Sequence, residues 1–211
     1  MNAAADEVLR AVLEGARTAG FLGPGPVEPH LRNARGFGEA VEDALERSPA
    51  NFADLGSGGG IPGLVLALRW PDSHGALVDS ARRRCAALRE AVDRLALDPR
   101  IEVVEDRGEA VGRAEEFRER FDVVTARSFA EPPVTAEIGA GLVGAGGILV
   151  VSEPPEVDDA RWPVAGLAEV GFAPAVHARF ADSHFVVIRK VGPVPDRYPR
   201  PVGRPGKRPL W

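Results

Sequence analysis

The stretch Asn51–Gly63 reads Asn-Phe-Ala-Asp-Leu-Gly-Ser-Gly-Gly-Gly-Ile-Pro-Gly, and it decides the fold class. A short apolar run leads into a cluster of glycines, and the apolar segment 64–68 that follows has helical character. A strand, a glycine turn and a helix in this order open a nucleotide-binding α/β domain. Glycine lets the backbone approach a ligand closely, and Pro62 suits the first turn of a helix. The stretch therefore predicts a ligand loop; a glycine-rich turn without a ligand is the alternative.

Two ligand fingerprints overlap in this loop. The first is the dinucleotide pattern G-x-G-x-x-G with an acid about twenty residues further on, matched by Gly58, Gly60, Gly63 and Asp79. The second is the acidic-x-G-x-G-x-G loop of S-adenosylmethionine (SAM) enzymes, matched by Asp54, Gly56, Gly58 and Gly60. A carboxylate beside the loop attracts the ammonium and sulfonium of SAM and repels a pyrophosphate. Asp54 therefore favours SAM over NAD as the cofactor.

From residue 52 onward, short apolar strands alternate with helical segments. Strands are expected at Phe52–Leu55, Gly75–Val78, Ile101–Glu105, Phe121–Ala126, Gly147–Ser152, Ala173–Phe180 and His184–Val191. Helices are expected at Ala4–Ala19, within 29–45, at Ile61–Arg69 and Ala81–Ala96, through Ile138 and at Asp158–Val170. This order predicts an α/β fold, a doubly wound and mostly parallel Rossmann-like sheet. The last two strands are too close for a crossover helix and should form an antiparallel hairpin, which is typical of SAM-dependent methyltransferases.

Composition describes an ordinary globular chain. Of 211 residues, 45% are hydrophobic and 27% are charged, which suits one domain able to bury a core. The single Cys85 excludes an intramolecular disulfide and a cysteine-based metal site. No apolar run is long enough to span a bilayer, and acids stand where a signal peptide has bases. We therefore expect a cytoplasmic monomer that binds no metal.

The charge is unevenly distributed along the chain. Residues 189–211 hold seven bases and one acid, a net +6, which leaves −11 for the rest because the total is −5. This segment is rich in proline, which excludes a helix or a central strand. It is either a disordered tail or an extended basic arm for RNA phosphates, anchored by Tyr198 or Trp211. The bases expected to bind RNA are Arg197, Arg200, Arg204, Lys207 and Arg208.

These features divide the chain into three expected parts. Residues 1–48 form an N-terminal helical extension, residues 49–191 form the SAM-binding domain, and residues 192–211 form the basic C-terminal arm.

Residues at three strand ends are candidates for the ligand site, because ligands lie at the carboxyl ends of strands in an open α/β sheet. Asp79 can accept the ribose hydroxyls of SAM, or it can cap the next helix. Gly108 and Glu109 follow the third strand, where adenine would lie; alternatively, Glu109 favours a helix N-terminus. Arg127 follows the fourth strand, where the methyl acceptor is expected, and an arginine can bind a guanine edge or a phosphate bidentately.

Several of these segments together resemble one protein family. The segments are Asp54–Gly63, Asp79-Ser80 with Arg83-Arg84, Arg107-Gly108-Glu109, Arg127-Ser128-Phe129 and the tail Tyr198-Pro199-Arg200 through Leu210. They are similar to those of the bacterial small-subunit ribosomal RNA guanine-N7 methyltransferases, also called glucose-inhibited division protein B. The resemblance covers 30–210 and is densest over 53–129.

The resemblance implies a cofactor, a substrate and site residues. The cofactor would be SAM, and Gly56, Ile61, Gly108, Glu109 and Arg127 stand where the family has its SAM contacts. Together with Asp54, Ser57, Gly58 and Gly60 of the loop and Asp79 at the strand end, they are the residues expected to bind it. The substrate would be a guanine of small-subunit ribosomal RNA or of the small ribosomal subunit, with Arg127 in the catalytic role. Guanine N7 carries a lone pair and no proton, so methylation there needs positioning and no general base.

The chain also departs from the family in two places. The Trp-Asn…Asn-Leu signature of the N-terminal helices is absent, and Ser152-Glu153-Pro154-Pro155 stands where the family has Lys-Gly. Glu153 would place a carboxylate near the positive charge that the methylated base acquires. A small-molecule SAM methyltransferase, or a SAM-binding protein without activity, is therefore the alternative function.

Overall fold

A computed structural model describes residues 3–156 and 158–211 of the chain. Its strands are β1 (Asn51–Leu55), β2 (His74–Asp79), β3 (Ile101–Glu105), β4 (Phe121–Ala126), β5 (Val143–Glu153), β6 (Val176–Phe180) and β7 (Ser183–Arg189). Its helices are α1 (Ala3–Thr18), α2 (Val27–Leu45), α3 (Gly63–Arg69), α4 (Arg82–Arg94), α5 (Gly108–Val111), α6 (Pro132–Leu142), α7 (Val164–Glu169) and α8 (Arg204–Lys207). Residues 1, 2 and 157, which the expected segments 1–48 and 49–191 include, lie outside the described residues.

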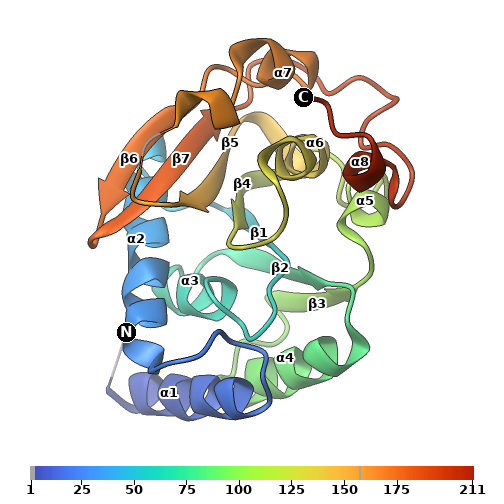
Figure 1. Cartoon of the computed structure of the whole chain (residues 1–211). Coiled ribbons are helices and arrows are strands. Elements are labelled where there is room, and N and C mark those ends of the chain that lie inside the picture. The colour runs from blue at the N-terminus through green and yellow to red at the C-terminus, as the bar shows by residue number, and fades with distance from the viewer. Residues whose placement is uncertain (1–2, 157) are drawn as a thin grey trace.

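The seven strands form one sheet in the order β3-β2-β1-β4-β5-β7-β6 (Figure 1). Neighbouring strands from β3 to β5 pair in parallel, whereas β7 pairs antiparallel with both β5 and β6. The predicted doubly wound sheet with a C-terminal antiparallel hairpin is confirmed. The chain leaves β1 toward β2 on one side and returns to β4 on the other, so the switch point of the sheet lies between β1 and β4.

Alternate residues of the central strands face two separate cores. In β1, Phe52 belongs to the first core and Ala53 to the second; in β5, Ile148 and Leu149 divide in the same way. This is the alternation expected when both faces of a sheet are covered. The first core takes its other members mainly from α1, α2, α3 and α4. The second takes them from α5, α6, α7 and the C-terminal segment.

Apart from shifts in the bounds of other elements, one predicted helix and the predicted lack of helix in the tail differ in the structure. The single helix expected at Asp158–Val170 is a 3-10 turn at Asp159–Arg161 followed by α7. Pro163 separates the two because proline lacks an N–H group and clashes with the preceding turn of a continuous helix. The expectation that proline excludes helix from the tail is also wrong, because the tail contains the single helical turn α8. Pro205 lies in the first turn of α8, where proline is tolerated.

The C-terminal segment, residues 192–211, packs against the body of the protein. Val194 and Tyr198 are buried in the second core, and Leu210 and Trp211 pack against it. Figure 1 shows this segment running past α6 and α5 to reach α8. Among the described residues, no helix is both long enough and apolar enough to cross a membrane.

Candidate functional site

Asp54 holds the glycine loop from below. Its carboxylate is 1% exposed; Oδ2 accepts from Gly63 N at 3.1 Å and Oδ1 accepts from Thr125 Oγ1 at 2.8 Å. The side chain thereby ties the end of β1 to the start of α3 and to β4. Burial raises the pKa of Asp54 to about 6, against the opposing effect of these hydrogen bonds and of the Arg127 charge. Asp54, the residue that indicated SAM in the sequence, therefore holds the glycine loop in its conformation.

Close approach explains two of the glycines. A Cβ on Gly63 would lie 2.4 Å from Leu77 Cδ2 and 2.8 Å from Asp54 Oδ2. Gly56 has φ +71°, and a Cβ there would lie 2.7 Å from Phe129 Cδ2. Either side chain would push the loop away from the strands that it caps.

Asp79 joins the loop to the next helix. Its Oδ2 accepts from Gly58 N at 3.0 Å, and its Oδ1 accepts from Ala81 N at 2.8 Å. Arg84 Nη1 lies 3.5 Å from Oδ2. Both alternatives from the sequence remain compatible, because a carboxylate has further lone pairs and Asp79 also borders an open cleft.

This cleft, of about 490 Å³, opens at the carboxyl ends of the strands. It is lined by Gly56, Val78, Asp79, Ser80, Arg84, Asp106, Arg107, Gly108, Glu109, Ser128, Phe129, Ala130, Glu131, Val134, Ile138, Gly203 and Gly206. Four of these residues are acidic and two are basic, which leaves the lining at a formal −2. SAM carries one net positive charge and two ribose hydroxyls, so an acidic cleft with Asp79 on its wall fits this cofactor.

The ten residues expected to bind the cofactor differ in how they stand to the cleft. Gly56, Asp79, Gly108 and Glu109 line the cleft. Gly58 donates its N–H to Asp79. Ser57, Gly60 and Ile61 are buried in the loop, and Asp54 lies beneath it. The remaining residue, Arg127, is not among the described residues that line the cleft.

Arg127 lies between the end of β4 and α2. Its Nη2 donates to Nδ1 of His30 at 2.5 Å. A guanidinium has no acceptor, so this contact requires the neutral His30 tautomer that carries its proton on Nε2. Burial and the Arg127 charge lower the pKa of His30, opposed by a hydrogen bond with the Gly23 backbone. Burial lowers the pKa of Arg127, and the Asp54 carboxylate raises it.

A second hollow of about 290 Å³ adjoins this cleft and shares Ser128, Phe129 and Ala130 with it. Its other wall includes Glu153 at the end of β5 and Arg161. The sequence pointed to Glu153 as a carboxylate near the positive charge that the methylated base acquires. The structure instead pairs its Oε2 with Arg161 Nε at 2.8 Å, so its charge is balanced.

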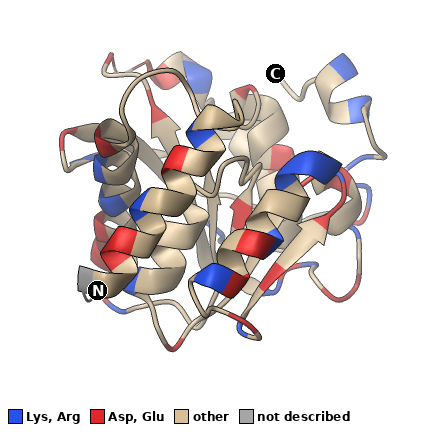
Figure 2. Ribbon diagram, turned by 90° about the horizontal axis from the view of Figure 1, so that it is seen from below, with Lys and Arg blue, Asp and Glu red and all other residues tan. Residues whose placement is uncertain are grey.

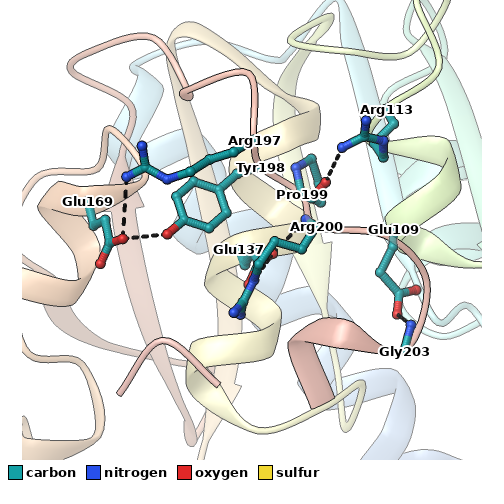
Figure 3. A network of polar contacts seen from close by, with 9 residues as sticks. All are labelled: Glu109, Arg113, Glu137, Glu169, Arg197, Tyr198, Pro199, Arg200 and Gly203. Carbon is teal, nitrogen blue, oxygen red and sulfur yellow. Dashed lines mark hydrogen bonds and ion pairs between the residues drawn. The ribbon is translucent and has the colours of Figure 1, made fainter. Parts of the chain in front are cut away.

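The C-terminal segment contributes residues that the sequence analysis missed. Gly203 and Gly206 line the 490 Å³ cleft, and Gly203 N donates to Glu109 Oε1 at 3.0 Å. Figure 3 shows this contact beside the Arg200–Glu137 ion pair. No local pattern marks the two glycines as cleft residues, because their position follows from how the segment folds back over α5 and α6.

The five tail bases expected to bind RNA are engaged to different degrees. Arg200 is paired with Glu137, and Arg197 lies 3.5 Å from Glu169 and over the Tyr198 ring. Arg204, Lys207 and Arg208 are exposed and form no ion pair within residues 3–156 and 158–211. In Figure 2 blue residues mark α8 near the C-terminus and the first turn of α4, where three arginines stand in sequence.

Solved structures share this fold. A putative O-methyltransferase from Klebsiella pneumoniae has a TM-score of 0.61 at 16% identity, covering 88% of this chain and 90% of that one. The O-methyltransferase from Bacillus cereus, solved in complex with SAH (S-adenosylhomocysteine), has a TM-score of 0.60 at 16% identity, covering 87% and 90%. At this identity the likeness concerns the fold.

Sequence comparison identifies the family. The model of the GidB family, described as rRNA small subunit methyltransferase G, matches residues 29–153. The chain is 39% identical over 169 residues to ribosomal RNA small subunit methyltransferase G of Roseiflexus castenholzii, covering 77% of this chain and 72% of the relative. It is 35% identical over 185 residues to the protein of the same name from Roseiflexus sp., covering 84% and 79%. The chain therefore belongs to the GidB family of small-subunit ribosomal RNA methyltransferases, as its loop and tail segments predicted.

Proposed function

We propose that this protein transfers the methyl group of SAM to N7 of a guanine in small-subunit ribosomal RNA. The observation that carries the proposal is an acidic cleft at the switch point of the sheet, lined by Gly56, Asp79 and Gly108, in a chain of this family. When bound, SAM supplies an electrophilic methyl group on its sulfonium.

The chain's own residues supply binding and position. Asp79 lies where it can accept the ribose hydroxyls, and Gly108 allows the backbone to approach the adenine. Ser128 and Phe129 lie between the cofactor cleft and the adjoining hollow, so an acceptor base in that hollow would face the methyl group. Guanine N7 has no proton to give, so the reaction needs position and no general base in that hollow.

Arg127 is proposed to act on the acceptor. Its position next to β4 and its contact with neutral His30 leave a charged guanidinium near the strand end. There it would hold a phosphate or guanine O6 of the substrate, since a cation beside N7 would oppose the positive charge of the product.

The proposed division of labour follows the three expected parts of the chain. Residues 49–191 would form most of the cofactor cleft, and residues 192–211 would complete its wall through Gly203 and Gly206 and present exposed bases to RNA. A ribosomal RNA substrate would place the work in the cytoplasm, and a single copy of the chain suffices for the cleft. An experiment on the oligomeric state, such as light scattering, tests the last point.

The proposal is tested by methyl transfer from tritiated SAM to small-subunit RNA from cells that lack the protein. The labelled RNA is digested and its nucleosides are separated. Label in 7-methylguanosine supports the proposal, whereas label in another nucleoside, or none with any RNA or subunit, contradicts it. Arg127→Ala is expected to lower transfer at least about tenfold, a loss of about 1.4 kcal/mol in transition-state stabilisation.

A further inference from the structure

The C-terminal segment forms one wall of the cofactor cleft. Gly203 and Gly206 border the same space as the glycine loop residue Gly56 and the β2 residue Asp79. Gly203 is joined to the cleft wall by its hydrogen bond to Glu109, whose side chain is buried at the start of α5. A ligand that fills the cleft therefore lies against residues far along the chain from the glycine loop.

A buried ion pair holds this wall in place. Glu137 on α6 is 0% exposed, and its Oε1 accepts from the backbone N and Nε of Arg200 at 2.7 and 2.9 Å. Its Oε2 accepts from Arg200 Nη2 at 2.5 Å. A buried carboxylate without its cation is strongly unfavourable, so Glu137 keeps Arg200, and with it the segment that leads to Gly203, against α6.

Further contacts clamp the same segment between α5 and α6. Arg113 Nη1 donates to Pro199 O at 2.8 Å, and Arg118 Nη1 donates to Tyr198 O at 2.7 Å. A Cβ on Gly112 or Gly141 would lie 2.9 or 2.6 Å from the Pro199 ring, so this ring fits between two glycine positions. Figure 3 shows the Arg200–Glu137 ion pair, the contact of Arg113 with the Pro199 carbonyl and the Glu109–Gly203 hydrogen bond along one short stretch of chain.

We propose that residues 198–203 form a strap that sets the width of the cofactor cleft, with Arg200 and Glu137 as positioning residues for cofactor binding. The inference rests on the proposed function for the identity of the ligand, SAM or its product SAH. Neither side chain is among the described residues that line the cleft, and both act through Gly203 and Glu109. If the ligand binds more tightly when residues 198–203 are docked against α6, ligand binding stabilises the docked segment. By linkage, the two effects have the same coupling free energy.

The first test is calorimetric titration of the full chain with SAH. Arg200→Ala is expected to raise the Kd at least about tenfold, because the strap leaves the cleft wall, and Arg200→Lys to recover part of the loss. In methyl transfer at a fixed RNA concentration, the KM for SAM is expected to rise in Arg200→Ala. Unchanged SAH affinity in Arg200→Ala would overturn the strap.

The matched control is Arg69→Ala. Arg69 forms a similar bidentate pair with Glu42, at 2.7 Å for each of its two hydrogen bonds, and neither residue lines the cleft. Arg69→Ala should lower the melting temperature and leave the Kd for SAH unchanged. An equal rise of the Kd in both variants would mean that the effect of Arg200→Ala comes from a general loss of stability. That result would also contradict the proposed strap.

Proteolysis gives a readout that needs neither RNA nor methyl transfer. Trypsin can cleave after the exposed Lys207, whereas Arg204 and Arg208 each precede a proline and resist the protease. SAH is expected to slow this cleavage in the unmodified chain and not in Arg200→Ala; equal protection of both would overturn the proposal. If the unmodified chain binds no SAH at all, the assignment of the cofactor is wrong. If SAH binds equally well with and without Arg200, only the proposal of the strap is wrong.

Discussion

At the scale of single residues, the site depends on ionisable groups that folding has moved away from water. Asp54 is buried beneath the loop, and burial together with the Arg127 charge favours the neutral form of His30. The pKa of Asp54 is raised and that of His30 is lowered, so the two groups affect stability in opposite directions as the pH changes.

The first prediction concerns Asp54. Its pKa is about 6 in the folded protein, against an ordinary value of 3.8 for an aspartate in an unfolded chain, so the folded state holds the extra proton between these values. The free energy of unfolding should therefore fall as the pH rises from about 4 to above 6, by about 3 kcal/mol from this group. Denaturant titrations across this range test it. Asp54→Asn should flatten the profile, and an unchanged slope would contradict the assignment.

The second prediction concerns His30. Because its pKa is lowered from 6.5, the unfolded chain binds more protons below that pH. The contribution of His30 is therefore complete above pH 6.5 and is lost as the pH falls, since a protonated ring cannot accept from Arg127. His30→Gln should remove this loss in urea titrations between about pH 7.5 and 5. If the two profiles run parallel, Arg127 does not depend on the His30 proton.

At the scale of elements, the glycine loop works because it is tied to three strands at once. Asp54 at the end of β1 binds the start of α3 and Thr125 of β4, and Asp79 at the end of β2 binds Gly58. The two carboxylates thus accept hydrogen bonds from the N–H groups of Gly58 and Gly63, on the side of the loop that faces the protein. The opposite side of the loop faces the cleft. This arrangement explains how a loop with several glycines keeps one conformation.

The third prediction places a methyl group at this junction. Gly63→Ala would bring a Cβ to 2.4 Å from Leu77 Cδ2 and 2.8 Å from Asp54 Oδ2. Overpacking of this kind costs about 1–3 kcal/mol, and here it also displaces the carboxylate that holds the loop. Thermal unfolding should show a lower Tm, and SAH titration a higher Kd. Gly15→Ala, on α1 with no atom of the described residues within 4 Å of the added Cβ, is the control that should leave the Kd unchanged and should not lower the Tm, since alanine favours a helix.

At the scale of the whole molecule, an acidic body carries a docked basic segment. The same segment both lines the cofactor cleft and presents Arg204, Lys207 and Arg208 to solvent. RNA bound by these bases would therefore lie close to the methyl donor. The basic segment is thus a part of the folded body, and its exposed face is what remains for phosphates.

The fourth prediction concerns the salt dependence of RNA binding. Each phosphate contact with single-stranded RNA contributes about −0.7 to the slope of log K against log salt. Replacing Arg204, Lys207 and Arg208 by glutamine should therefore reduce the slope by about 2. Filter binding over a range of salt concentrations measures it. Arg17→Gln with Arg35→Gln, two exposed bases on the N-terminal helices, should leave the slope as it is; an equal change there would point to net charge alone.

Much of the fold could be predicted from local sequence. The strand-glycine-helix order after residue 51 and the alternation beyond it depend on spacing within short windows, and the short interval between the last two strands imposed the hairpin. The acids Asp54 and Asp79 were found by their distance from the glycines. These two acids stand at the carboxyl ends of β1 and β2. Parallel strands run in the same direction, so these ends meet at one edge of the sheet.

Only the tertiary structure decided which groups these residues contact. Glu109 meets Gly203 across 94 positions, and Arg127 meets His30 across 97. A proline-rich segment has no periodicity that reveals whether it extends into solvent or folds back, and burial of Tyr198 against α6 decided between them. The sequence by itself determined the sheet, the loop and the cofactor class, since these follow from local spacing and residue chemistry. The closed wall of the cleft depends on a buried carboxylate, Glu137, finding its cation on a distant segment.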